Sequence, residues 1–266
     1  MLGPQEFVEY TEDIVETINK LDINDHLFAD DSQLLDHMRL GAVMEHRKRL
    51  ETCIENMKDW CSSRRLQLNP DKTELIWFGS RANLSNLKRL DVMSLTLCSV
   101  VIEPVDSVRD LGVILDSELS MQKHIGKVYS LCFFHIRRLR KLRSMLDQSS
   151  TQRLVSAFIL SRIDYCNAAR AGLPATTLAP LVRVLNAAAR LVTGTNEVHT
   201  TEMMRSLHWL QIAYRIRFKL CVLVHDIVNG RSPAYLSDTT TRTSSLPGRS
   251  RLRSAGTNQF DVREHE

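Results

Sequence analysis

The hydrophobic pattern of this chain changes period at Met121, and no other feature constrains the fold as strongly. Before Met121, apolar residues occur in short runs separated by turn residues, a pattern typical of strands and hairpins with few helices. After Met121, they recur with the helical period almost to the end of the chain. We therefore predict an α+β fold, in which a small antiparallel sheet with helices is followed by an all-α region.

The same pattern divides the chain into regions. Its 266 residues are enough for one or two domains with a sizeable core. We place the sheet-containing domain at residues 1–120, a helical domain at 121–236 and a flexible tail rich in Ser, Thr and Arg at 237–266. Within the helical domain, helices are expected at about residues 122–146, 150–165, 176–193 and 209–229.

The first region reads as a series of short elements. A short acidic helix at 5–20 precedes a hairpin at 23–36 and a long amphipathic helix at 41–64. A turn at Asn69-Pro70 then leads into a buried strand at 75–79, because the residue before a proline disfavours the helical conformation. Further short strands are expected at 95–97, 100–102 and 108–115.

Two adjacent acids, Asp30 and Asp31, lie in the predicted turn of the first hairpin. Carboxylate oxygens are the ligands that Mg²⁺ prefers, and nucleotidyl transfer uses two such ions bridged by several acids. Asp is also common in turns for a simpler reason, since its side chain bonds to the turn backbone. Asp30 and Asp31 are therefore candidate metal ligands, with a solvated turn as the alternative.

The middle of the chain is basic. The net charge is only +4, but no acidic residue occurs between Gln122 and Leu146. An apolar stripe in this window predicts a helix whose core face points inward and whose cations point outward. Such a face is suited to phosphate contact, although a solvated basic surface is the usual alternative. The cations of this window are Lys123, Lys127, Arg137, Arg138, Arg140, Lys141 and Arg143.

Cysteine usage and hydropathy indicate the compartment. The six cysteines are scattered without a CxxC pair, which favours neither a zinc site nor a disulfide framework. We interpret them as reduced thiols, mostly buried, in an intracellular protein of the cytoplasm or nucleus. No signal-peptide pattern and no apolar run of membrane-spanning length is found, so no membrane association is expected.

Four motifs in order resemble the reverse transcriptases of non-LTR retrotransposons, in particular jockey-like and related LINE elements. Leu2-Gly3-Pro4 resembles the end of the motif that closes over the incoming nucleotide. Phe28-Ala29-Asp30-Asp31 resembles the metal-binding palm hairpin, and Leu68 to Glu74 resembles the next palm motif. Val108 to Asp116 resembles the primer-grip hairpin, and residues 121–236 resemble the helical thumb and connection region.

The resemblance implies roles for individual residues. Asp30 and Asp31 would hold Mg²⁺, Lys72 would lie near the triphosphate, and Gly112 would lie on a strand close to a nucleic-acid backbone. The partners would be an RNA template and a DNA primer, bound as an RNA–DNA duplex. The thumb contacts would come from the outward cations of the basic window, namely Lys127, Arg137, Arg138, Arg140, Lys141 and Arg143.

The family's metal site also uses an aspartate from an earlier strand, and its fingers grip the nucleotide. Neither precedes Asp30 in this sequence, so we expect an RNA-directed DNA polymerase by descent that is inactive alone. Two alternatives remain at this point. One is a non-catalytic nucleic-acid-binding module that keeps the thumb contacts. The other is a decayed fragment without a role, which an uncovered sheet edge would make unstable.

Overall fold

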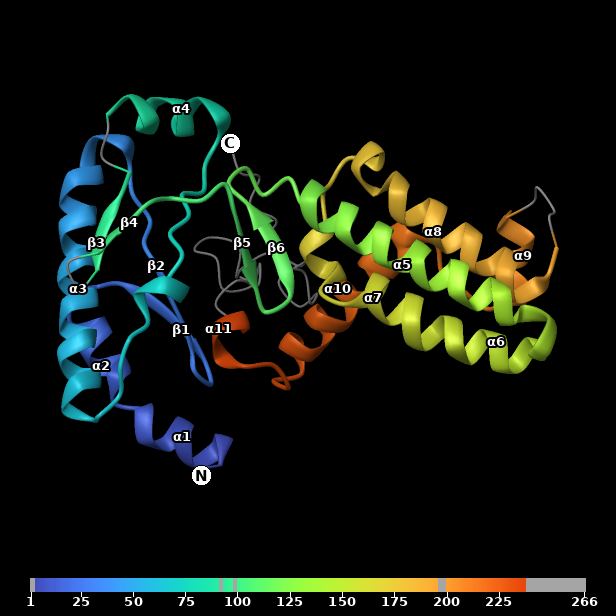
Figure 1. The fold of residues 1–266 in the computed structure, drawn as a ribbon, viewed down its shortest axis with the longest axis horizontal. Helices are drawn as coiled ribbons and strands as arrows, with labels where there is room; N and C mark the ends of the chain where they lie inside the picture. Colours follow the sequence, from blue (N-terminus) through green and yellow to red (C-terminus); the bar gives the residue numbers. More distant parts are fainter. Residues whose placement is uncertain (1–2, 91–92, 98–99, 196–199, 238–266) are drawn as a thin grey trace, which may run out of the picture. The chain divides into compact units, whose positions relative to one another are not determined.

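The structure is a computed structural model, and it describes residues 3–90, 93–97, 100–195 and 200–237. It separates into two compact units, Met1–Lys123 and His124–Glu266. Figure 1 shows the difference between them: the first contains all the strands of the described chain, and the second is helical. The predicted α+β class is confirmed. Leu2 of the first motif and residues 238–266 of the predicted tail lie outside the described residues.

The first unit is built around a long helix, α3 (Val43–Ser63), which confirms the predicted amphipathic helix. The helix predicted at 5–20 is instead two helices, α1 (Pro4–Thr11) and α2 (Ile14–Asn19). Among the side chains that the structure describes in these two helices, those buried against α3 come from α2. At the end of α1, the hydroxyl of Thr11 donates back to the carbonyl of Phe7. The core of this packing consists of Ile14, Ile18, Ile23, Cys53, Met57 and Cys61.

The strands of the first unit form three separate antiparallel hairpins rather than one sheet. The first joins β1 (Asn24–Phe28) to β2 (Asp31–Leu35). The second joins β3 (Leu95–Leu97) to β4 (Val100–Ile102), with Leu95 and Leu97 buried. The third joins β5 (Ser107–Asp110) to β6 (Val113–Asp116). The first hairpin and the two strands of the second were predicted from the sequence, whereas the stretch predicted as one strand at 108–115 is a hairpin, as the family resemblance implied. The predicted assembly into one small sheet was not correct for the described residues.

The predicted strand at 75–79 does not form. Leu75 makes a single bridge to Pro104, and its carbonyl accepts from the backbone N–H of Val105 at 2.8 Å. The ladder cannot extend through Pro104, because proline has no backbone N–H to donate. A helix that the sequence analysis missed follows: α4 (Arg81–Arg89), whose start is capped by the Ser80 hydroxyl, which accepts from the N–H of Asn83 at 3.3 Å.

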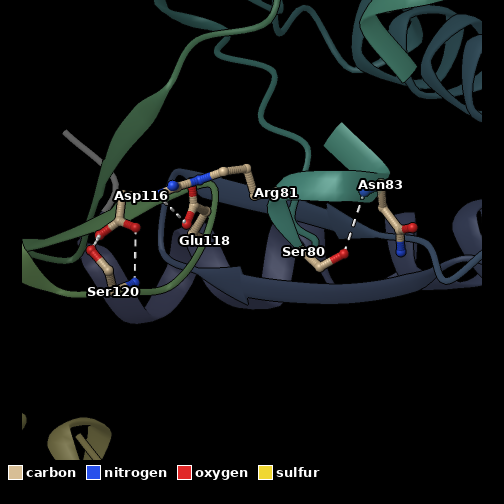
Figure 2. Close-up of polar contacts among 6 residues, drawn as sticks. All are labelled: Ser80, Arg81, Asn83, Asp116, Glu118 and Ser120. Carbon is tan, nitrogen blue, oxygen red and sulfur yellow. Dashed lines mark hydrogen bonds and ion pairs between the residues drawn. The ribbon is translucent and has the colours of Figure 1, made fainter. Parts of the chain in front are cut away.

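A buried aspartate organises the end of the first unit. Asp116 is 8% exposed, and its carboxylate accepts from the backbone N–H groups of Ser120 and Met121, both at 2.8 Å. These bonds hold a tight loop in which Leu119 and Met121 have positive φ, a conformation that costs energy in residues other than glycine. Figure 2 shows this loop with the Arg81–Glu118 ion pair on its surface. The next helix begins directly after this loop.

The second unit is a helical assembly (Figure 1). Its longest helices are α5 (Gln122–Leu142), α8 (Ala175–Thr193) and α10 (Ile212–Val228). The predicted helix at 150–165 is present but interrupted: α6 (Gln148–Val155) passes through a π-helical segment, Ser156–Leu160, into α7 (Ser161–Asp164). Two short helices were not predicted, α9 (Thr200–Ser206) and α11 (Ala234–Ser237).

The core of the second unit follows the predicted periodicity. Helix α5 buries one stripe at helical spacing, and α8 buries a wider one that includes Leu181, Val184 and Leu185. Helix α8 and the π-helical segment both contact α5. Arg183 of α8 lies over the ring of Tyr129, and Phe158 of the π-helical segment stacks on the ring of His135. The buried stripe of α5 is Ile125, Val128, Cys132, Ile136 and Leu139.

Among the described residues, Cys53, Cys61 and Cys132 are buried free thiols, whereas Cys166 and Cys221 are exposed. Burial raises the pKa of Cys53 and of Cys132 to about 11, so both are protonated and unreactive at neutral pH. No helix in the described ranges has the length and apolar character needed to cross a membrane.

Candidate functional site

The two candidate metal ligands lie at the tip of the first hairpin. Phe28 pairs with Asp31 across β1 and β2, which leaves Ala29 and Asp30 as the two turn residues. Ala29 has a φ of 55°, as a tight hairpin turn requires. The carboxylates of Asp30 and Asp31 are both exposed. The predicted hairpin with acids at its end is therefore confirmed.

These acids do not complete a metal site by themselves. A two-metal site needs several carboxylates that bridge the ions. Across the part of the chain that the structure describes, no group of three or more His, Cys, Asp or Glu side chains comes together to hold a metal ion. Asp30 and Asp31 supply oxygen donors from one turn only, which is too few for a site that holds two ions. No catalytic step is therefore assigned to Mg²⁺.

Lys72 lies in a short 3₁₀ turn, Pro70–Lys72, rather than at the start of a strand. The turn is held by Asn69, whose side chain accepts from the N–H of Asp71 at 3.1 Å. The Lys72 side chain is exposed, and within the described residues no ion pair or hydrogen bond joins it to Asp30 or Asp31. The expected grouping of Lys72 with these two acids thus has no direct bond to support it in the part of the chain that the structure describes.

The first and third hairpins are joined by a polar contact. Gln33 of β2 donates to the carboxylate of Asp110 on β5 at 2.5 Å, so the two segments that resemble palm and primer-grip hairpins are linked in one unit. The prediction that Gly112 lies on a strand was wrong, because it lies in the turn between β5 and β6. Its φ of 89°, next to Leu111 at 41°, explains the glycine by turn geometry alone.

We expect Gly112→Ala to lower the free energy of unfolding by about 1 kcal/mol, because alanine is strained at positive φ. Gly126→Ala is the matched control. Gly126 lies within α5, and a methyl group added there would meet nothing within 4 Å. It should stabilise the chain by up to about 1 kcal/mol. Urea unfolding of both variants checks this, and a neutral Gly112→Ala would contradict the turn assignment.

The outward face of α5 is cationic, as predicted. Its buried stripe lies on one side, and the residues on the opposite side are exposed. This outer face carries no acidic residue, since α5 contains none. Exposed cations along a rigid helix can contact successive phosphates of a nucleic-acid strand. The exposed cations of α5 are Lys123, Lys127, Arg137, Arg138, Arg140 and Lys141.

Arg143 does not belong to this face, which corrects the sequence analysis. Its guanidinium donates to the carbonyls of Leu191 at 2.9 Å and Val192 at 3.2 Å, at the C-terminal end of α8, and to that of Leu146 at 3.0 Å. A cation at a helix C-terminus satisfies carbonyls that have no partner within the helix. Arg143 therefore serves the packing of the second unit and is not available to phosphate.

A buried polar network in the second unit was missed by sequence reasoning. Arg170 is 1% exposed, and it donates to the carbonyls of Ile163 at 2.5 Å and Tyr165 at 3.0 Å. Its other contact is His124 Nε2 at 3.5 Å. Burial, followed by the charges of Arg170 and Lys127, lowers the pKa of His124, which keeps this imidazole neutral.

The same network joins two helices. Asp164, at the end of α7, accepts from Arg215 of α10 at 2.6 Å. Burial lowers the pKa of Arg170 while Asp164 raises it, so the nearby carboxylate partly offsets the burial of the cation. Cys166 has a positive φ of 48° where the chain turns after α7. The signal in the sequence was the dense run of polar residues among apolar helices, but nothing local identified the partners.

Comparison of the chain with models of protein families, with curated proteins and with solved structures finds no match in any of the three.

Proposed function

We propose that this chain is the palm and thumb portion of an RNA-directed DNA polymerase related to those of non-LTR retrotransposons. On its own it binds an RNA–DNA duplex and does not extend the primer. The motif order supports the descent, and the observation that carries the binding function is the outer face of α5. That face presents exposed cations along a rigid helix that contains no acid.

The electrostatics favour a polyanion over other partners. A duplex presents closely spaced phosphates, and their neutralisation by cations releases condensed counterions. Along α5, Lys127, Arg138 and Lys141 share one side of the helix, so they can follow one strand of a duplex. Phosphate contacts of this kind position the nucleic acid without reading its sequence.

The test measures binding of the full 266-residue chain to a short RNA–DNA hybrid as salt rises from about 0.05 to 0.2 M. We expect salt-sensitive binding, with the logarithm of affinity falling by about 0.9 for each phosphate contacted per decade of salt. The control is a neutral polymer in place of the hybrid. Absence of hybrid binding at low salt would overturn the proposal.

Primer extension on an RNA template with Mg²⁺ tests the second half of the proposal. We expect no extension by the chain or by its Asp30→Asn, Asp31→Asn double variant, because two acids on one turn do not fit two metal ions. Extension that is lost in the double variant would show that a further ligand completes the site. Extension that survives it would assign the chemistry to other residues. Either result would contradict the proposal that the chain does not extend a primer.

A further inference from the structure

An aromatic cluster lies within the cationic surface of the second unit. Phe134 is on the outer face of α5, at helical spacing between Lys127 and Arg138, and it is 45% exposed. The guanidinium of Arg138 lies 5.5 Å from the centre of its ring. A large exposed aromatic ring is costly in water unless it has a partner, and one placed among cations is unlike a core residue.

Two further rings extend this cluster. The ring of His135 meets that of Phe134 edge-on at 5.4 Å between centroids, and it stacks on Phe158 at 5.2 Å with 19° between the planes. Phe158 is 41% exposed. We name the three rings of Phe134, His135 and Phe158 the aromatic platform. Its members come from two segments that the fold brings together, α5 and the π-helical segment.

The local structure and charge suit such a platform to a ligand. A π-helical turn is rare and often marks functional sites, and here it presents Phe158. Burial, followed by the charges of Arg162 and Arg138, lowers the pKa of His135, so the imidazole is a neutral stacking ring at pH 7. Arg162 is exposed on α7, four residues after Phe158, and its charge acts on His135, so it adds a second cation near the platform.

We propose that the aromatic platform binds the unpaired bases of a single nucleic-acid strand, with Arg138 and Arg162 contacting its phosphates. Every base has a flat π face that stacks on an aromatic ring, and the flanking cations match the charge of the strand. The choice of ligand rests on the proposed nucleic-acid function. It adds binding of an unpaired strand to the proposed binding of a duplex. The site shares Arg138 with the duplex contacts and differs from them because it uses rings as well as charge.

The test uses the full chain and two fluorescent single strands of about 12 nucleotides, within the roughly 4 to 16 typical of such sites. One is oligo(dT), and the other has the same backbone without bases. We expect oligo(dT) to bind about tenfold more tightly than the abasic strand. Phe134→Ala and Phe158→Leu should each remove most of this preference while leaving abasic-strand and hybrid binding unchanged.

Phe218→Leu is the matched control, because Phe218 is 61% exposed on α10 and is not part of the platform. It should leave every affinity unchanged. Equal affinity of the wild-type chain for oligo(dT) and the abasic strand would overturn the platform while hybrid binding persists. A preference for oligo(dT) that survives both platform variants would overturn it as well. Loss of all binding, to strands and to the hybrid alike, would instead overturn the proposed function.

Discussion

Replacing Arg170 with methionine is expected to lower the free energy of unfolding by about 3–5 kcal/mol. Methionine fills a similar volume but cannot donate, so the buried carbonyl of Ile163 and the part-buried carbonyl of Tyr165 lose their bonds from the guanidinium. The neighbouring Asp164 also loses the positive charge that partly balances its own. Because a domain is stable by only about 5–15 kcal/mol, this single change should bring the second unit close to unfolding.

Urea unfolding followed by circular dichroism measures this effect, and Arg190→Met is its control. Arg190 is an exposed arginine of α8, so its replacement should change stability by no more than about 0.5 kcal/mol. Arg170→Lys keeps the charge but cannot donate to two carbonyls in a fixed geometry, and it should be destabilising too. If Arg170→Met lowered the free energy of unfolding by less than about 1 kcal/mol, the bonds from Arg170 to the carbonyls of Ile163 and Tyr165 would not be important for stability.

The second large effect is expected in duplex binding. Changing Lys127, Arg137, Arg138 and Lys141 together to glutamine should lower affinity for an RNA–DNA hybrid by about a hundredfold or more at low salt. The salt slope should fall by about 0.9 for each lost phosphate contact. These side chains are exposed, so the fold should survive, and an unchanged circular dichroism spectrum checks this.

A second variant with the same change in charge separates local contact from net charge. It replaces four exposed cations of other helices (α3, α4 and α10) with glutamine, namely Lys48, Lys88, Arg89 and Lys219. We expect its affinity to fall far less, because scattered charges are screened beyond about 10 Å at 0.1 M salt. Equal losses in the two variants would mean that only the total charge matters, and the α5 surface would then not be a binding site.

The sequence predicted well wherever the structure depends on near neighbours. The inward and outward faces of α5 follow from the helical period, so Ile125 and Ile136 are buried and Lys127 and Arg138 exposed as expected. The hairpin that carries Asp30 was likewise predicted, from the apolar runs on either side of its turn. Helix α4 could have been found by the same reasoning, because Ser80 is a standard N-cap and Lys88 and Arg89 favour the last turn.

The errors arose where a residue's partner is distant in the sequence. A strand at 75–79 needed a donor that Pro104 cannot supply, 29 residues away from Leu75. Arg143 was placed among phosphate-binding cations because a run of basic residues does not show which of them the fold itself uses. Its acceptors are carbonyls of Leu191 and Val192, 48 and 49 residues further on.

The sequence by itself determined the α+β class, the hairpin that carries Asp30 and the cationic face of α5, because periodicity and turn chemistry act within a few residues. Only the tertiary structure decided which polar groups hold the fold and which remain exposed. Arg170 meets His124 across 46 residues, and the rings of His135 and Phe158 meet between separate segments. Burial gives such contacts their importance, since a polar group removed from water must find its partner wherever the packed chain supplies one.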